Sequence, residues 1–198
     1  MPPAPASVSN AANQRGSIVR LPQGAEITLD ALLYCTLMAS GNDAAVVIAE
    51  FISGSESNMV QQMNRIASEL GMNNTKFNDC TGVQSFDNRS TTRDLTTLAL
   101  EILRIFPQIT EYTTYQNMTI RYTLGNDEVE LNIHNTNQLL GSMQGVYGLK
   151  TGTAQTSHNV IVLMRKDNRD LMVIILDAPD SFARWRAAKT LLEFGISR

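Results

Sequence analysis

One short stretch of the chain combines the residue types that can hold an anionic group. Lys150, Thr151, Gly152 and Thr153 follow an apolar, β-prone run at residues 146–149, and lysine is scarce, with four in 198 residues. A glycine lets the backbone approach a ligand closely, and an ammonium group with two hydroxyls can donate hydrogen bonds to an anion. The triplet Lys150-Thr151-Gly152 is also typical of an exposed strand end, so this candidate site needs support from elsewhere in the chain.

That support comes from a second motif, Ser40-Gly41-Asn42, which lies far upstream of the first. Apolar stretches typical of helices flank it on both sides, at residues 29–37 and 44–52. A short polar turn between two such helices would be held rigidly, which fixes the serine hydroxyl and the asparagine amide for chemistry. The alternative is that Ser40 or Asn42 only caps the second helix.

The elements that must position these residues are predicted from helical periodicity, capping residues and strand alternation. Helices are predicted at 29–37 with Thr28 as N-cap, at 44–52, 55–70, 90–106 and 181–194; strands at 17–21, 146–151, 158–165 and 171–176; and a hairpin at 117–133. Residues 1–23, rich in proline and alanine, are expected to be poorly organised, and residues 24–198 to form one domain. Helices come first and an antiparallel sheet with a closing helix comes last, which is typical of the α+β class.

Composition argues against several classes of function. A net charge of -3, from 16 basic and 19 acidic side chains, is unlike the basic face of a nucleic-acid-binding protein. No apolar run approaches the ~20 residues of a membrane span, and the opening residues lack the pattern of a signal peptide. Cys35 and Cys80 are expected to be unpaired, and neither they nor His134 and His158 have metal-ligand spacing, so we expect no metal and no cofactor.

Taken together, the two motifs resemble those of the penicillin-recognising serine enzymes, which combine S-x-x-K, S-x-N and K-T-G elements. Within this β-lactamase/transpeptidase-like superfamily the chain is most similar to the low-molecular-weight D-alanyl-D-alanine carboxypeptidases. Further similar stretches lie, in family order, at residues 69–77, 90–95, 135–140 and 191–195. The resemblance runs from about Leu21 to Gly195 and implies a helical subdomain with an antiparallel sheet flanked by helices. It implies removal of the terminal D-alanine from peptidoglycan stem peptides through an acyl-enzyme, without a cofactor.

The resemblance also assigns catalytic roles to three residues. Ser40 would pass a proton to the leaving D-alanine, and Asn42 would orient the substrate amide. Lys150 would add positive charge beside Ser40 and the terminal carboxylate of the substrate. Ser40 and Asn42 both need a rigid turn for these roles.

The remaining site residues are implied to bind substrate. The hydroxyls of Thr151 and Thr153 would donate hydrogen bonds to the carboxylate, and the backbone along Gly152 and Thr153 would pair with the peptide as an added strand and help to form the oxyanion hole. Arg184, at the start of the last predicted helix, matches a family arginine that holds the carboxylate. Arg186 is the alternative if the alignment shifts by two residues, and a solvated helix face is the structural reading of either arginine.

The chain departs from the family at the nucleophile, because no serine in the sequence is followed three residues later by lysine. We expect a chain truncated at its N-terminus, without the first strands and the nucleophile helix, and inactive by itself. The full-length enzyme would act outside the cytoplasmic membrane, with D-Ala-D-Ala stem peptides and β-lactam antibiotics as its ligands. The alternatives are a non-catalytic module that binds stem peptide or a partner protein, and, less favoured by the similar stretches, a β-lactamase.

Overall fold

The computed structural model describes residues 5–9, 14, 16–83, 87–154 and 157–198. The strands are β1 (Ala6–Ser7), β2 (Glu26–Ile27), β3 (Asn117–Leu124), β4 (Asp127–His134), β5 (Val146–Ala154), β6 (Ser157–Lys166) and β7 (Arg169–Ala178). The helices are α1 (Leu29–Leu37), α2 (Asn42–Ser53), α3 (Glu56–Glu69), α4 (Thr92–Ile105), the 3-10 turn η2 (Pro107–Thr110), α5 (Glu111–Thr114) and α6 (Ser181–Ile196). The predicted α+β class is confirmed.

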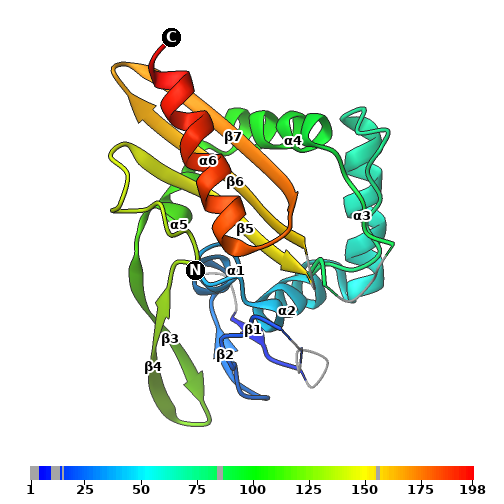
Figure 1. Cartoon of the computed structure of the whole chain (residues 1–198). Coiled ribbons are helices and arrows are strands. Elements are labelled where there is room, and N and C mark those ends of the chain that lie inside the picture. The colour runs from blue at the N-terminus through cyan, green and yellow to red at the C-terminus, as the bar shows by residue number, and fades with distance from the viewer. Residues whose placement is uncertain (1–4, 10–13, 15, 84–86, 155–156) are drawn as a thin grey trace.

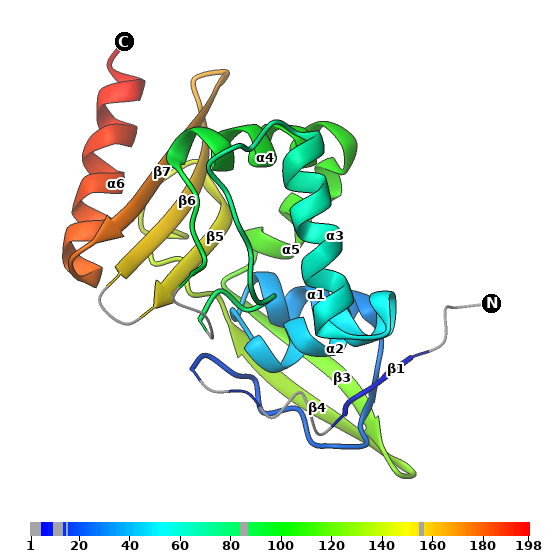
Figure 2. The same cartoon turned by 90° about the vertical axis from the view of Figure 1, so that its right-hand side faces the viewer.

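A three-stranded antiparallel sheet in the order β5-β6-β7 forms the upper half of the molecule in Figure 1, and α6 crosses its front. Figure 2 shows this sheet between α6 on one side and the helices α1 and α4 on the other. Apolar side chains of α6, among them Trp185, Ala188 and Leu192, pack on Val160, Val162 and Val173 of the sheet. Burial of this apolar area holds β5 in place, and β5 carries Lys150.

The lower half is built around α1 and α2, which pack against a four-stranded antiparallel sheet in the order β1-β2-β3-β4 (Figure 1). Leu32 and Val47 are fully buried in this core, together with Ile27 of β2 and Ile120 of β3. Thr28 caps α1 as predicted, because its hydroxyl accepts a hydrogen bond from the Ala31 amide at 3.2 Å. The turn between α1 and α2 is therefore held by two buried helices.

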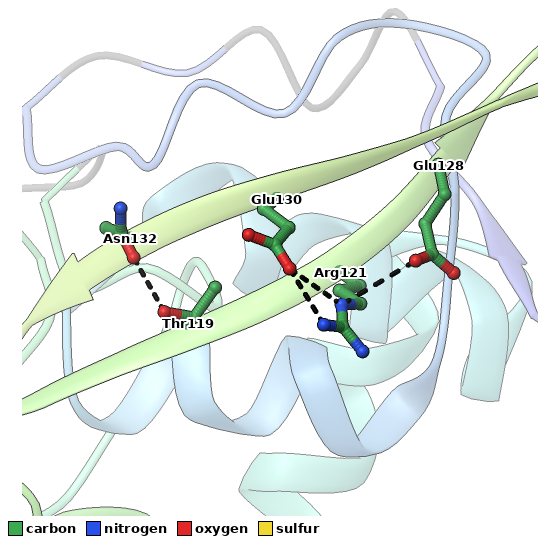
Figure 3. A network of polar contacts seen from close by, with 5 residues as sticks. All are labelled: Thr119, Arg121, Glu128, Glu130 and Asn132. Atoms are coloured by element: carbon green, nitrogen blue, oxygen red, sulfur yellow. Dashed lines mark hydrogen bonds and ion pairs between the residues drawn. The ribbon is translucent and has the colours of Figure 1, made fainter.

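The β3–β4 hairpin, predicted from its alternation, carries a polar network on one face (Figure 3). The Arg121 guanidinium lies 2.8 Å from a carboxylate oxygen of Glu130 and 3.6 Å from one of Glu128, and the Thr119 hydroxyl donates to Asn132 at 2.7 Å. These side chains are exposed, so water screens the charges and the ion pairs add little to stability. Their main effect is to favour one register of the two strands.

The strand predicted at residues 17–21 does not form, so that prediction is wrong. Its backbone amides are used in another way: the Val19 and Leu21 N–H groups donate to the Asp43 carboxylate at 3.1 and 3.0 Å. Arg20 between them has φ 64, outside the range of a strand. The residue types of this segment favour a strand. The backbone N–H groups that would pair with a neighbouring strand instead donate to the Asp43 carboxylate.

Other early residues take part in the lower core. Ala6 and Val8 are 1% and 2% exposed, and β1 pairs with β2. The domain boundary at residue 24 remains a prediction. Among the described residues, no helix has both the length and the apolar character that crossing a membrane requires.

Candidate active site

The first half of the site is the tight turn between α1 and α2. Ser40 has φ 60, a backbone conformation that is uncommon for a residue other than glycine. At Gly41 a side chain would begin only 3.2 Å from the Cys35 carbonyl oxygen and 3.1 Å from Asp43 Oδ1, so any larger residue would have to displace these neighbours by a few tenths of an ångström. Gly41 is also the N-cap of α2, and no described side chain caps this helix by a hydrogen bond. The alternative that Ser40 or Asn42 serves only as a cap is therefore wrong.

The residues before α1 hold this turn in place. The backbone N–H of Asn42 donates to the Ser17 carbonyl at 2.8 Å, and the Ser17 hydroxyl donates to the Ala39 carbonyl at 3.1 Å. Asp43, only 2% exposed, accepts hydrogen bonds from the amides of Val19, Leu21 and Ala44. With its backbone groups satisfied in this way, the turn has little freedom to move.

The second half of the site is β5, which pairs with β6 and lies at the edge of its sheet as the structure describes it. The Lys150 ammonium donates to the Ser40 hydroxyl and, at 2.6 Å, to the Thr151 carbonyl. The contact joins two residues that are 110 positions apart in the chain. The structure thus brings together the two motifs singled out in the sequence.

Burial controls the charge of Lys150. Removal of the ammonium from water, and to a smaller extent the nearby Arg184 cation, lowers its pKa from 10.5 to about 8. Near neutral pH the side chain is still largely protonated and supplies positive charge to the site. In mildly alkaline solution a substantial fraction is the neutral amine, which can accept a proton.

A third segment, which sequence reasoning did not place in the site, connects the two halves. The Thr136 hydroxyl lies 2.5 Å from the Thr151 hydroxyl, and the Thr136 amide donates to the Met38 carbonyl at 3.1 Å. Next to it, the Asn137 side-chain amide donates to the Gly148 carbonyl at 3.1 Å. The sequence signal for this role was the run Asn-Thr-Asn at 135–137, which begins the family-like stretch at 135–140 but was given no function.

Arg184 reaches the site from the first turn of α6. Its Nη1 donates to the Gly152 carbonyl, the Thr153 hydroxyl and the Asn159 carbonyl, each at 3.2 Å. Only 6% of the residue is exposed, its guanidinium lies 4.5 Å from the centre of the Trp185 ring, and burial lowers its pKa. Arg184 thus contacts Thr153 and the glycine of the Lys-Thr-Gly triplet directly.

Arg186 takes a different position. It is exposed, and its guanidinium lies 5.3 Å from the ring centre of the exposed Phe182. Of the two arginines considered from the sequence, Arg184 is the one with hydrogen bonds to the site.

The predicted site residues form two hydrogen-bonded groups that adjoin along β5. Lys150 is bonded to Ser40 and Thr151, and Arg184 is bonded to Gly152 and Thr153, with Asn42 two residues from Ser40. A side chain starting at Gly16 would lie 3.0 Å from the amide nitrogen of Asn42, so this segment closes one side of the Asn42 side chain. The arrangement offers an ammonium, a guanidinium and an exposed hydroxyl beside an edge strand. Such a group can bind a carboxylate at the end of an extended peptide.

Comparison with known proteins finds similar sequences and similar folds. A family model described as D-alanyl-D-alanine carboxypeptidase matches residues 3–180. The chain is similar to D-alanyl-D-alanine carboxypeptidase DacF of Bacillus subtilis, with 35% identity over 191 residues, covering 96% of this chain and 48% of that protein. It is 31% identical to a D-alanyl-D-alanine endopeptidase of Pseudomonas aeruginosa, over 94% of this chain and 60% of that protein. The chain thus spans about half the length of the first of these relatives.

The fold is similar to that of the Streptomyces K15 DD-transpeptidase. The two structures superpose with a TM-score of 0.92 at 23% identity, over 98% of this chain and 79% of that one. The D-alanyl-D-alanine carboxypeptidase DacD of Francisella tularensis superposes with a TM-score of 0.83 at 22% identity, over 98% of this chain and 58% of that one. At these identities the likeness shows the fold, which is the transpeptidase-like fold expected from the sequence.

Proposed function

The chain belongs to the D-alanyl-D-alanine carboxypeptidase family of serine-type hydrolases, and from this premise we propose that residues 24–198 carry the leaving-group and carboxylate-binding part of such a site. The ligand proposed is a peptidoglycan stem peptide that ends in D-Ala-D-Ala, acted on outside the cytoplasmic membrane. The observation that carries the proposal is the hydrogen bond from the Lys150 ammonium to the Ser40 hydroxyl. It gives the serine a charged partner of the kind that proton transfer to a leaving amine requires.

The hydroxyl of Thr153 is the best-placed donor for the substrate carboxylate. It accepts a hydrogen bond from Arg184, which leaves its own proton to be donated to a ligand. Thr153 is exposed, whereas Thr151 is 7% exposed and already bonded to Thr136. In this proposal Thr153 contacts the carboxylate, Arg184 orients Thr153 and adds positive charge, and Thr151 fixes the strand.

The edge position of β5 supports the way the peptide backbone would bind. Among the described strands β5 is hydrogen-bonded to β6 on one side, and its other side faces the Ser40 turn. An extended peptide can add to such an edge through main-chain hydrogen bonds. The scissile amide would then lie between the strand and Asn42, with the terminal carboxylate toward Thr153.

The sequence holds no serine that is followed three residues later by lysine, and this limits the reaction that the chain can carry out. The proposal therefore gives Ser40 and Lys150 proton transfer to the leaving D-alanine, and it gives the 198-residue chain alone no peptide hydrolysis. The missing pair favours one further candidate function, a non-catalytic module that binds stem peptides. For the full-length enzyme, β-lactams are proposed as ligands of the same site.

Peptide binding tests the proposal directly. The chain is titrated with diacetyl-L-Lys-D-Ala-D-Ala, and amide NMR shifts give the dissociation constant, with the same peptide ending in L-Ala-L-Ala for comparison. Lys150→Met should weaken binding of the D-Ala peptide by about tenfold, because the positive charge that Lys150 adds beside the terminal carboxylate is lost. Lys189→Met is the matched control, since Lys189 is an exposed lysine on α6 paired with Glu193 at 3.8 Å.

Equal affinity for both peptides, or wild-type affinity in the Lys150→Met variant, would rule the proposal out. Both candidate functions, the carboxypeptidase and the non-catalytic module, include binding of this peptide. The genomic DNA upstream of Met1 distinguishes between them. An open frame there that encodes Ser-x-x-Lys favours the carboxypeptidase, and D-alanine release by the protein it encodes would then be assayed. A stop codon there favours the binding module.

A further inference from the structure

The contact between Ser40 and Lys150 supports a reaction that the proposed function does not use. A serine hydroxyl bonded to a partly buried lysine amine is the arrangement by which serine–lysine hydrolases generate a nucleophile. We propose that Ser40 and Lys150 form such a nucleophilic pair, in which Ser40 Oγ reacts covalently with small activated acyl or phosphonyl esters. In the proposed function Ser40 only passes a proton, whereas here its oxygen forms the new bond.

The surroundings of Lys150 suit it to act as a base. One of its N–H groups is directed to the Thr151 carbonyl at 2.6 Å, which fixes the amine beside the Ser40 oxygen. When the amine is neutral, its lone pair can accept the serine proton. Burial lowers the pKa of Lys150 to about 8, so the neutral form is present in mildly alkaline solution.

Few charges act on this amine. Arg184 approaches from α6 and favours the neutral form of Lys150. The elements on its other sides present hydroxyls, Ser40 from the α1–α2 turn and Thr136 through Thr151. Asp43, the carboxylate closest to Ser40 along the chain, accepts from backbone amides on the far side of the turn and so is not directed at the pair.

Ser40 also has the position of a nucleophile. It lies on a sharp turn with φ 60, it is partly exposed, and its hydroxyl points to β5. The next residues begin α2, a helix of 12 residues. The partial positive charge at the start of a helix stabilises negative charge that develops on a nearby oxygen. Nucleophilic serines of α/β-hydrolases are presented on comparably strained turns.

The reaction is written for a fluorophosphonate probe. Ser40 Oγ attacks phosphorus, the Oγ–P bond forms, the P–F bond breaks and fluoride leaves with the bonding electrons. The hydroxyl proton passes to Lys150 Nζ and from there to solvent. Fluoride needs no proton in order to leave, unlike the amine of a peptide. The pair can therefore react with activated esters without a second residue that protonates the leaving group.

The test is labelling of the 198-residue chain with a biotinylated fluorophosphonate between about pH 7 and pH 10, read by intact mass and peptide mapping. We expect one adduct, on Ser40, formed at a rate that rises with pH and levels off above the pKa of Lys150. Ser40→Gly should abolish the adduct, and it suits the turn because glycine tolerates positive φ. Lys150→Met should slow labelling by about a hundredfold, the usual size of general-base assistance.

Ser53→Ala is the matched control and should label at the wild-type rate, because Ser53 is also partly buried but its hydroxyl is bonded to Gln62. Circular dichroism confirms that each variant is folded. An adduct on another residue, labelling that survives Ser40→Gly, an unchanged rate in Lys150→Met, or no adduct at any pH would each overturn the proposal. None of these results affects the D-Ala-D-Ala titration, which measures carboxylate recognition and no covalent step.

Discussion

Replacing Lys150 by methionine should change how the stability of the protein depends on pH. Methionine keeps the unbranched chain but cannot be charged. The pKa of Lys150 is lowered by burial to about 8 in the folded protein, against 10.5 for the side chain in water. Between these two values the unfolded chain binds more protons than the folded one, so the free energy of unfolding rises with pH. The penalty for burying the ammonium is complete below about pH 8 and is lost above about pH 10.5.

The magnitude follows from the same two values. They differ by about two and a half pH units (10.5 against about 8), and each unit corresponds to about 1.4 kcal/mol, so the full penalty is about 3 to 4 kcal/mol. The pKa of 10.5 in the unfolded chain lies above pH 10, the highest pH at which unfolding would be measured. About 2 to 3 kcal/mol of the full penalty should therefore be lost between about pH 7 and pH 10. The Lys150→Met variant should lack this rise, so its stability relative to wild type should be highest near neutral pH.

Urea unfolding followed by fluorescence measures the effect, since Trp185 is the one tryptophan of the chain and is buried between α6 and the sheet. Wild type and variant are compared at four pH values, and the difference between their unfolding free energies is plotted. Tyr34 and Tyr112, whose pKa values are raised by burial, also titrate at high pH, but they do so in both proteins and cancel in the difference. A difference that stays constant within about 0.5 kcal/mol, or that changes with the opposite sign, would refute the burial of a charged Lys150.

Three further substitutions test how the turn is held. Asp43→Ala leaves three backbone amides without their acceptor and should cost about 3 to 5 kcal/mol in urea unfolding; a loss below about 1 kcal/mol would contradict this account. Gly41→Ala should cost about 1 to 3 kcal/mol, because the added methyl meets the Cys35 carbonyl at 3.2 Å, and an unchanged urea midpoint would show that the turn can relax. Thr136→Val keeps the shape but removes the hydroxyl bonded to Thr151, so it should cost about 1 kcal/mol and weaken D-Ala-D-Ala binding by NMR titration; unchanged affinity would exclude Thr136 from the site.

Local signals in the sequence were enough for most of the elements. Thr28 and Thr91 cap α1 and α4 through their hydroxyls, and Gly71, with φ 71, directly follows the C-cap of α3. Such signals depend on residues within one turn of each other, so tertiary contacts rarely override them. The C-terminal strands were also found, although each was predicted a few residues short, at 146–151 against Val146–Ala154 for β5.

The parts that could not be predicted depend on contacts between distant segments. The Asp43 carboxylate orders the chain at residues 19–21, a contact over 22 and 24 positions that no local pattern predicted. Thr136 matters because the hairpin returns it to the end of α1 and to β5 at once. A sequence pattern does not predict a contact between such distant segments when the partners are single hydroxyl and carbonyl groups.

The site lies where two hydrophobic cores meet, which explains why neither motif was decisive by itself. Ser40 is placed by the core around α1 and α2, and Lys150 by the core between α6 and the three-stranded sheet. A small third cluster contains Leu149, the residue before Lys150, and Leu37 at the end of α1 packs against this cluster. The distance between the serine and the lysine is therefore set by the packing of this junction. Both motifs can stay intact while a change of apolar volume at Leu37 or Leu149 separates their functional groups, so the geometry of the pair is a property of the fold and not of either triplet.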